Sequence, residues 1–581
     1  MQTIDYLVVF LYVLGIVAAG MVFASRMKNS KEMFSAGGQS PWWVSGLSGF
    51  MTMFSAGTFV IWGGIAYRYG VVAIVINLGY GVAAILVGRF VAGYWKKLGV
   101  DSAPEFLQMR FGGSVVQFYT WYKGTIQLFQ MGGSVYALSK IVCTLMPLPA
   151  GHFLADPSTG HLSVSLVSIA LCVMVIIITF VGGLWAVLMT DVLQFVILTI
   201  SVIFVVPLIL GEAGGWGSFI SQTPEGFLHP VAADFSWWFI IGWMLVNFFN
   251  LSGEWTFVQR YLCVPTAKDA KKSAYLVGVL YLVSPVIWMI PPLVYRVLNE
   301  GVDPEQAYIL SCQLVLPAGM MGLMVAAMAS ATASMATTRL NVFAGAFTTE
   351  VYHRVINKDA SERRLVAIGR LVTVILGCIV IAGTLLIPRY GYTSFIIDIN
   401  TLLSGPMLLP TLWGLFSKKI DPKAIWITVS VGFVSAFLIK FGLSRDGFLT
   451  DVQALSWLVD WIAGNSRIVD LLAGIAAPLL ILSFLEITGQ KEHAGWGRVM
   501  EFKKNFREHE RVKASTLPGK MVVISMLMIS VVMGILALVS EDDAGILLSF
   551  SLVVLALAGV VYYFLRRADE KSSKSSERIA A

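Results

Sequence analysis

Three carboxylates stand inside long apolar stretches of the chain, at Asp191, Glu254 and Asp398. A charged side chain is costly at membrane depth, so an acid in such a position usually holds an ion, a proton or a solute. Ser334 and Thr338 lie in another apolar stretch and are four residues apart, so their hydroxyls would share one face of a helix. This spacing suits a shared cation. The residue types therefore predict reversible binding of an ion and a solute, without covalent chemistry.

Two apolar stretches are interrupted by glycine next to hydroxyl residues, at 54–58 (FSAGT) and 250–254 (NLSGE). An unwound helix at mid-membrane exposes backbone carbonyls and half-helix ends, which bind ions and small substrates in secondary transporters. Small residues also allow helices to pack closely. The glycine and serine pattern alone leaves both interpretations open.

These residues lie in apolar spans, and the length of most spans approaches the roughly 20 residues that a helix needs to cross a bilayer. Of the 581 residues, 57% are hydrophobic and 13% are charged, whereas soluble proteins have about 45–50% and about 25%. The fold class predicted is an all-α membrane protein of about 15 transmembrane helices, because β-barrel strands would alternate apolar and polar residues. The predicted spans are 4–25, 42–66, 71–95, 114–146, 163–183, 184–211, 236–258, 273–297, 314–350, 365–387, 391–416, 422–443, 468–486, 521–540 and 544–565.

Lysine and arginine follow the loops rather than forming a basic face, so the net charge of +7 does not indicate a nucleic-acid partner. The loops on one side collect most of these cations, among them Lys97, Arg110 and Arg260. The positive-inside rule then places the amino terminus outside and the carboxyl terminus in the cytoplasm of a plasma or inner membrane. The basic segment 487–520 is expected to form either an amphipathic helix on the inner leaflet or a solvated loop.

The two interrupted spans are the second and the seventh, five places apart. Because five is odd, units covering 42–211 and 236–416 must lie in the membrane with opposite orientations, which makes an inverted repeat. Residues 1–30 then hold a leading peripheral helix, and 417–566 hold additional helices. The cytoplasmic tail, 567–581, is rich in serine and lysine and is expected to be disordered.

Several short motifs occur in a fixed order over roughly residues 30–440. They are FSAGG at 34–38, PWW at 41–43, AYRYG at 66–70, GGL at 182–184, TDVLQ at 190–194, QRYL at 259–262, KDAK at 268–271, LN at 340–341 and FTT at 347–349. In this order the chain resembles the sodium/solute symporter family, which includes the sodium/glucose cotransporters. The resemblance implies a LeuT-type core of two inverted five-helix repeats and sodium-driven transport of a small organic solute by alternating access.

The resemblance also implies a main sodium site at the first interruption. Its ligands would be the backbone oxygens of Met51, Phe54 and Ala331 together with the Ser334 hydroxyl. The position of a second hydroxyl is Met335, and a thioether is a poor ligand for a hard cation. The site would therefore use four protein ligands, a water molecule or another nearby oxygen.

A further sodium is implied at Asp191, shared with the hydroxyls of Thr337 and Thr338. The alternative for this acid is a structural ion pair, with Arg339 as the candidate partner. Sodium is the expected coupling ion. Proton coupling through Asp191, Glu254 or Asp398 stays open.

The sugar contacts of the family match a set of polar positions here: Thr58, Asn77, Glu254, Tyr281 and Asp398. Phe257 matches an aromatic residue that closes the inward path. Two carboxylates in one cavity would repel each other unless a cation, a proton or hydroxyl groups lay between them. The pattern therefore favours a sugar, a polyol or an amine-bearing solute over an anion.

Other classes of function are less well supported by the residues. A membrane enzyme would need paired histidines, a metal set or a nucleophile near the membrane surface, and the sequence offers none, so an enzyme is not predicted. A proton-coupled or uncoupled carrier, or a sensor with the same fold, stays an alternative. A monomer in the lipid bilayer is expected.

Overall fold

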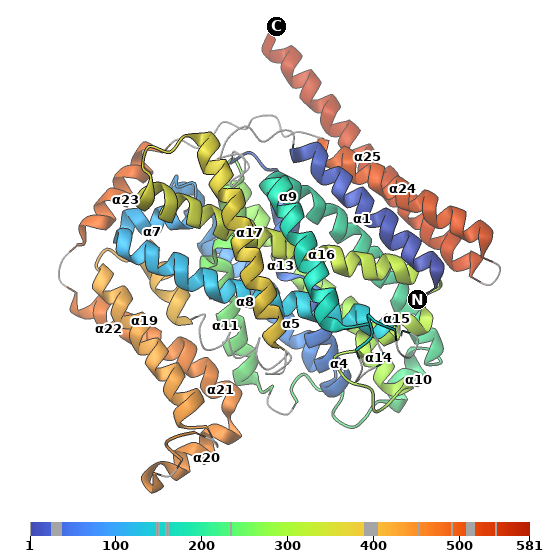
Figure 1. Ribbon diagram of the computed structural model, residues 1–581, viewed down its shortest axis with the longest axis horizontal. Coiled ribbons are helices and arrows are strands. Elements are labelled where there is room, and N and C mark those ends of the chain that lie inside the picture. Colours follow the sequence, from blue (N-terminus) through green and yellow to red (C-terminus); the bar gives the residue numbers. More distant parts are fainter. Residues whose placement is uncertain are drawn as a thin grey trace.

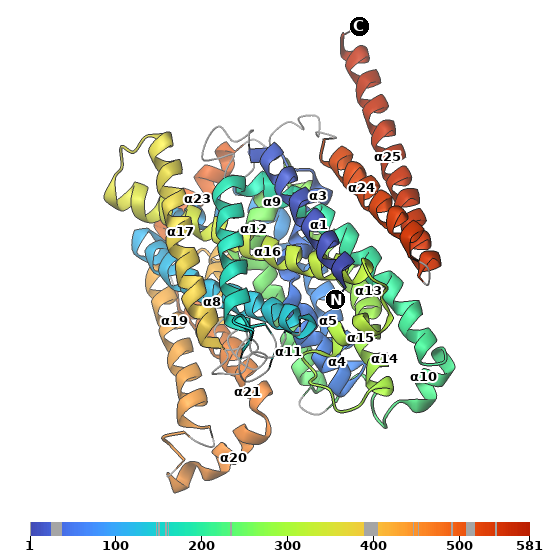
Figure 2. The ribbon, with the colours of Figure 1, turned by 45° about the vertical axis from the view of Figure 1, so that its right-hand side comes forward.

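The computed structural model describes most of the chain, and the described residues are predominantly helical (Figures 1 and 2). Strand pairing within them is limited to two isolated bridges, so the predicted all-α class is confirmed. The ranges described are 2–24, 38–146, 148, 152–156, 160, 162–232, 235–387, 405–444, 447–450, 452–489, 492–506, 517–540 and 543–580.

Along the chain the helices form two sets, those within residues 42–386 and those before or after this stretch. The first group, in chain order, is α3 (Trp42–Met53), η2 (Thr58–Trp62), α4 (Gly63–Tyr69), α5 (Val72–Phe90), α6 (Ala92–Lys97), α7 (Ala103–Phe111), α8 (Gly113–Leu145), α9 (Val164–Glu212), α10 (Trp216–Gln222), α11 (Trp237–Gly253), α12 (Trp255–Leu262), α13 (Ala267–Trp288), α14 (Ile290–Leu298), α15 (Ala307–Val315), α16 (Met320–Ala346), η3 (Phe347–Ile356) and α17 (Glu362–Leu386). The second group is α1 (Thr3–Ala24), α19 (Pro422–Phe437), η5 (Leu438–Gly442), η6 (Gln453–Leu455), α20 (Ser456–Gly464), α21 (Ser466–Leu471), η7 (Leu472–Ala476), α22 (Ala477–Thr488), α23 (Ala494–Asn505), α24 (Leu517–Val539) and α25 (Ala544–Ala580).

Eight described helices are long and apolar enough to cross a membrane, and a bent pair makes a ninth candidate. Three shorter apolar helices accompany them. The total of 15 spans stays a prediction, because some predicted spans fall partly on residues outside the described ranges.

Both predicted interruptions are present in the backbone. Helix α3 ends at Met53, Phe54 is extended, and the chain resumes as η2 and α4 at an angle of 59°. Helix α11 ends at Gly253, Glu254 is extended, and α12 begins at Trp255. Each break leaves backbone groups without a partner in their own helix, as a binding site between half-helices requires.

Helix α16 is the central element, and it packs against α9, α8, α3 and α1. The most apolar part of Met320–Ile356 is 89% buried, whereas the corresponding part of Ala544–Tyr563 is 28% buried. Small side chains such as Ala327, Ala331 and Ala336 are fully buried in α16 and let neighbouring backbones approach closely. The two breaks are thus packed around a well-covered helix, while α24 and α25 form a hairpin at the periphery next to α1 (Figure 2).

Three local expectations differ from the structure. The spans predicted at 163–183 and 184–211 form one helix, α9, without a non-helical residue at the boundary, because glycine weakens a helix by only about 1 kcal/mol and does not break it alone. The tail expected to be disordered continues α25, since its alanine, glutamate, lysine and arginine residues favour helix.

The third difference concerns the basic segment before α24. Its described part forms α23, as one interpretation expected, but Trp496 and Val499 on this helix are buried and α23 packs on α7. The Lys503 ammonium lies 4.4 Å from the centre of the Tyr94 ring. The apolar face of α23 therefore covers protein rather than the lipid leaflet.

Candidate ion and solute site

Asp191 on α9 is held by residues from three other helices. Its carboxylate accepts hydrogen bonds from the hydroxyls of Ser48 on α3 and Ser334 on α16. The Arg260 guanidinium on α12 lies 3.9 Å from the same carboxylate, and both side chains are only 1% exposed. The acid that the sequence selected therefore lies in a buried polar cluster that joins α3, α9, α12 and α16.

The partner of Asp191 is Arg260, and the candidate pairing with Arg339 was wrong. Arg260 Nε donates to Ser48 Oγ at 2.9 Å, and Nη2 donates to Thr338 Oγ1 at 3.0 Å. The sequence pattern had placed Arg260 among the cytoplasmic loop cations, but it is buried in α12. A buried charge needs such partners because its desolvation is expensive.

The residues predicted for the main sodium site lie where α3 ends against α16. Met51 O accepts the amide of Phe54 at 3.0 Å, and the amide of Ala56 donates to the Thr332 hydroxyl at 2.8 Å. Thr332 follows Ala331 directly in the sequence, so the break and the predicted α16 ligands are neighbours.

The hydroxyl residues of α16 divide between two environments. Ser334 contacts Asp191, and Thr338 contacts Arg260. Thr337 instead donates to the backbone oxygen of Ser334 at 2.9 Å. The structure therefore brings Ser334 and Thr338 to the acid cluster and turns Thr337 toward its own helix.

Glu254, in the second break, forms a buried ion pair with Lys123 of α8. Lys123 Nζ lies 3.1 Å from Glu254 Oε2, and the two side chains are 1% and 6% exposed. Lys123 also donates to the freed carbonyl of Gly253 at 3.1 Å and lies 5.2 Å from the centre of the Trp255 ring. Glu254 Oε1 accepts the Trp255 amide at 3.0 Å and so caps α12. An ammonium group therefore binds to the oxygens of the second break.

Sequence reasoning gave Lys123 no role. The signal was present, because Lys123 stands within the predicted span 114–146 and a lysine inside a span is functional by default. Its partner could not be found the same way, since Lys123 and Glu254 are far apart in the chain.

A cavity of about 140 Å³ lies between the two breaks. It is lined by residues of α3, η2, α5, α8, α11, α12 and α16, and the predicted substrate residues Thr58, Glu254 and Phe257 are among them. One water molecule needs only about 10–15 Å³ of such space. The cavity therefore has room for several waters or part of a small solute.

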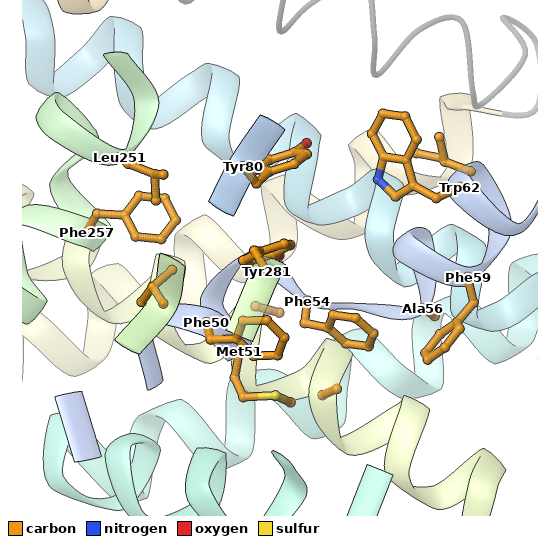
Figure 3. Close-up of a cluster of buried hydrophobic side chains, with 14 of the residues drawn as sticks. Phe50, Met51, Phe54, Ala56, Phe59, Trp62, Tyr80, Leu251, Phe257 and Tyr281 are labelled. Carbon is orange, nitrogen blue, oxygen red and sulfur yellow. The ribbon is translucent and has the colours of Figure 1, made fainter. Parts of the chain in front are cut away.

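Two predicted substrate residues are buried beside the cavity rather than on its wall. Asn77 donates to the backbone oxygen of Ala73 at 2.8 Å in its own helix. The Tyr281 ring stacks on Tyr80 with centroids 5.2 Å apart, and Tyr80 lines the cavity (Figure 3). Tyr281 thus supports a wall residue. The last predicted contact, Asp398, lies outside the described residues.

The remaining wall is richer in amides and aromatic rings than the sequence analysis expected. The residues that it missed include Gln127 and Gln130 on α8, Asn247 and Asn250 on α11, Arg339 on α16, and the aromatic residues Tyr80 and Trp243. The sequence contained a signal for the amide residues. The two glutamines are three residues apart, as are the two asparagines, so each pair shares one face of its helix. The rings form edge-to-face contacts, with the centroids of Trp62 and Trp243 5.7 Å apart.

These features define a membrane transporter with two broken helices around a polar chamber. The model of the sodium:solute symporter family matches residues 33–429. The match covers well over half of the chain, so the chain belongs to that family.

Similar proteins agree with this assignment. The sodium/sialic acid symporter NanT of Aliivibrio fischeri is 28% identical, over 78% of this chain and 90% of that protein. The sodium/glucose cotransporter of Vibrio parahaemolyticus is 25% identical, over 75% of this chain and 85% of its own.

Solved structures show the same fold. A substrate-bound, outward-open Na⁺-coupled sialic acid symporter aligns with a TM-score of 0.65 at 20% identity, over 82% of this chain and 98% of that one. Mhp1, a nucleobase-cation-symport-1 family transporter, aligns with a TM-score of 0.51 at 14% identity, over 82% and 99%. The fold is therefore the LeuT-type fold that the resemblance implied.

The predicted class of function is confirmed by the family. The protein is a multi-pass membrane transporter that couples a small solute to sodium, and it is not an enzyme. Sodium is its coupling ion. The individual ligands of sodium and solute stay predictions.

Proposed function

We propose that the cavity between the two breaks is the solute site of this symporter, and that it takes a small hydroxylated organic molecule. The observation that carries the proposal is that Thr58, Glu254 and Phe257, predicted from distant parts of the sequence, line one chamber. Amide side chains on the wall can donate and accept hydrogen bonds with hydroxyl groups. The aromatic rings offer apolar faces beside them. The relatives named for sialic acid, glucose and myo-inositol support the same chemistry.

The amine-bearing alternative loses the contribution of Glu254. It rested on the uncompensated charge of Glu254 and Asp398. Glu254 is paired with Lys123 at 3.1 Å, and this pair has no net charge. A hydroxylated solute therefore fits the described wall better than an amine does.

Sodium is proposed to bind at two places along α16. The first would use Met51 O, Phe54 O, Ala331 O and the Ser334 hydroxyl, with Met335 leaving room for a water ligand. Carbonyl and hydroxyl oxygens suit a hard cation. Such an ion would fix the angle between α3 and η2, and so the shape of the chamber.

The second sodium would bind Asp191 together with Ser334 and Thr338, with Thr337 contributing after a change of rotamer. Arg260 already contacts Asp191 and Thr338, so an ion there would compete with the guanidinium for the same oxygens. Because Arg260 belongs to α12, release of this pair would loosen the half-helix that follows Glu254. Ion binding would thereby be coupled to the solute chamber.

The test is uptake by proteoliposomes with sodium outside. Radiolabelled D-glucose, myo-inositol and N-acetylneuraminate would be compared under a sodium gradient, a proton gradient and no gradient. Sodium-driven accumulation that Glu254→Gln abolishes is the expected result. Accumulation driven by protons alone would support the alternative coupling, and equal uptake without any gradient would contradict symport.

We further propose a monomer in the plasma or inner membrane, with the amino terminus outside. The unequal distribution of lysine and arginine between the two sets of loops supports this orientation.

A further inference from the structure

We propose that a groove behind the second break is a binding site for a phospholipid with a primary ammonium headgroup, namely phosphatidylethanolamine of the surrounding bilayer. The groove has a volume of about 420 Å³ and lies between the end of α5, α11, α22 and the helix formed by residues 405–416. None of its described lining residues also lines the chamber between the breaks. The groove is therefore separate from the proposed solute site.

The wall of the groove suits a hydrocarbon chain. Its lining is mostly apolar and includes Phe248 and Phe249 of α11, Leu409 and Leu412 of the helix 405–416, and Leu479 of α22. A polar solute would lose hydrogen bonds with water against such a wall and form few in return. An acyl chain loses none, so it is the better occupant of this part of the groove.

The groove reaches from membrane depth to the membrane surface. Residues Ile468–Thr488 form a candidate membrane span, and Glu486, two residues before its end, lines the groove. On the same helix Leu480, Phe484 and Ile487 are exposed, as expected of a face that contacts lipid. Helix α22 packs against α19 at one edge of the molecule (Figure 1). The proposed orientation places this end of α22 in the inner leaflet, from which a phospholipid can enter.

Glu486 offers an acceptor for an ammonium group at the mouth of the groove. Its Oε2 accepts hydrogen bonds from Trp413 Nε1 at 3.0 Å and from the Ser417 hydroxyl. Within the described part of the chain these two donors are the hydrogen-bond partners of the carboxylate, and both use the same oxygen. Oε1 can therefore accept a hydrogen bond from a ligand.

Lys419 offers a donor for the phosphate beside that carboxylate. Its Nζ donates to the backbone oxygen of Glu486 at 2.9 Å, and an ammonium group has three N–H donors. The adjacent acid and base thus complement the ammonium and the phosphate of phosphatidylethanolamine through charge-assisted hydrogen bonds. Phosphatidylcholine has no N–H to donate, and phosphatidylglycerol has no ammonium group.

The inner wall of the groove contacts the second break. A Cβ placed on Gly253 would lie 3.2 Å from Leu412 Cγ and 3.6 Å from Leu408 Cδ2. Leu412 therefore packs on the break with one side and lines the groove with another. An acyl chain in the groove would hold this side chain against Gly253, whose carbonyl accepts the Lys123 ammonium. Lipid binding would thereby stabilise the backbone around the break.

The experiment measures lipid binding to the full chain after delipidation in detergent. Dioleoyl phosphatidylethanolamine, dioleoyl phosphatidylcholine and dioleoyl phosphatidylglycerol have the same acyl chains and differ in the headgroup. Their affinities would be obtained by titration followed by native mass spectrometry. Amide hydrogen exchange in residues 248–254 would be measured with and without phosphatidylethanolamine.

Four variants separate the parts of the site. Glu486→Gln removes the acceptor, while its amide oxygen can still accept from Trp413 and Ser417 and so preserve the fold. Leu479→Trp fills the groove. Lys419→Gln changes an exposed residue and removes the partner of the phosphate. Glu492→Gln is the matched control, because Glu492 is an exposed acid outside the groove.

Phosphatidylethanolamine should bind the wild-type protein about tenfold or more tightly than the other two lipids, as hydrogen bonds between charged groups predict. Glu486→Gln should remove this preference, and Glu492→Gln should leave it unchanged. Lys419→Gln and Leu479→Trp should each weaken the binding of all three lipids. Phosphatidylethanolamine should slow exchange in residues 248–254 of the wild type but not of Leu479→Trp.

The opposite results would overturn the inference. Equal affinity for the three lipids, or a preference that survives Glu486→Gln, would contradict the assignment of the headgroup. Unchanged binding in both Leu479→Trp and Lys419→Gln would contradict the groove as the site, and unchanged exchange in residues 248–254 would contradict the contact with the break. None of these measurements uses a transported solute, so their outcome is independent of the proposed function.

Discussion

The Lys123–Glu254 pair makes the second break sensitive to the loss of either partner. Lys123→Met would leave a buried carboxylate without compensation, and Glu254→Gln would do the same to the ammonium. Breaking a buried pair in this way costs about 3–5 kcal/mol. We expect each single variant to unfold at a clearly lower temperature in detergent, as followed by intrinsic tryptophan fluorescence.

The double variant provides the control. Lys123→Met with Glu254→Gln removes both charges, so most of the lost stability should return. Solute binding should stay absent, because Glu254 lines the cavity. Additive destabilisation in the double variant would show that the two residues do not act as a pair.

Asp191 is expected to set the affinity for sodium. Asp191→Asn keeps the shape but removes the charge that a cation and Arg260 share, so the sodium concentration for half-maximal uptake should rise about tenfold or more. The measurement is solute uptake as a function of external sodium.

A matched control for Asp191 is available in α1. Asp5 is also a buried acid, and its Oδ1 accepts the amides of Gly319 and Gly322 at 2.7 and 2.8 Å at the start of α16. Asp5→Asn should lower stability by about 1 kcal/mol, because hydrogen bonds to a neutral acceptor are weaker than those to a charged one, but it should leave the sodium dependence unchanged. An equal shift in both variants would assign Asp191 a structural role.

At the scale of elements, the contact of α23 with α7 should depend on pH. His493 Nδ1 accepts the amide of Gly495 at 3.1 Å and lies 3.3 Å from Arg110 Nη1, so the ring must be neutral at that nitrogen. Burial and the neighbouring Arg110 charge lower the pKa of His493. Because the folded pKa lies below the unfolded value of about 6.5, the stabilisation is present above that value and is lost as the pH falls through the folded pKa.

We therefore expect faster amide hydrogen exchange in α23 at pH 5 than at pH 7.5, after correction for the intrinsic rate. In His493→Gln the amide oxygen can accept the same hydrogen bond without titrating, so the pH effect should disappear. Exchange in α23 that changes equally in both proteins would contradict the role of His493.

The local breaks could be predicted from sequence, whereas the pairing of charges could not. Residues 54–58 and 250–254 carry their signal locally, in glycine and hydroxyl residues that weaken a helix. The partner of Asp191 depends on the direction that α12 takes after the second break, and sequence spacing contains no information on that direction. For this reason Arg339, which follows Thr338 in the sequence, was expected to be the partner of Asp191, and Arg260 was overlooked.

The same limit applies to the chamber. Thr58, Glu254 and Phe257 were found because family motifs mark their positions, and all three line the cavity. Lys123 was missed, although it explains why Glu254 is tolerated in the core. The Lys123–Glu254 pair also removes the charge of Glu254 from the argument for an amine-bearing solute, since the net charge of a chamber depends on which residues face one another.

At the scale of the whole molecule, the orientation can be tested by labelling. In the described part of the chain Cys378 is exposed and the other four cysteines are buried, so a Cys378→Ser variant should react little with a thiol reagent. In that background Gln2→Cys should react with a membrane-impermeant maleimide on intact cells, and Ser576→Cys should react only after permeabilisation. The reverse pattern would overturn the orientation inferred from the loop charges.

The Lys123 ammonium at Gly253 and Glu254 has a further consequence for a molecule built from two inverted halves. Lys123 is part of the polypeptide and cannot be released with the solute, whereas the sodium ion proposed at the first break would bind and dissociate in every transport cycle. The two breaks would then differ in how they are stabilised. The first would depend on the sodium concentration outside the protein, whereas the second would be stabilised by a lysine of the chain itself at any salt concentration.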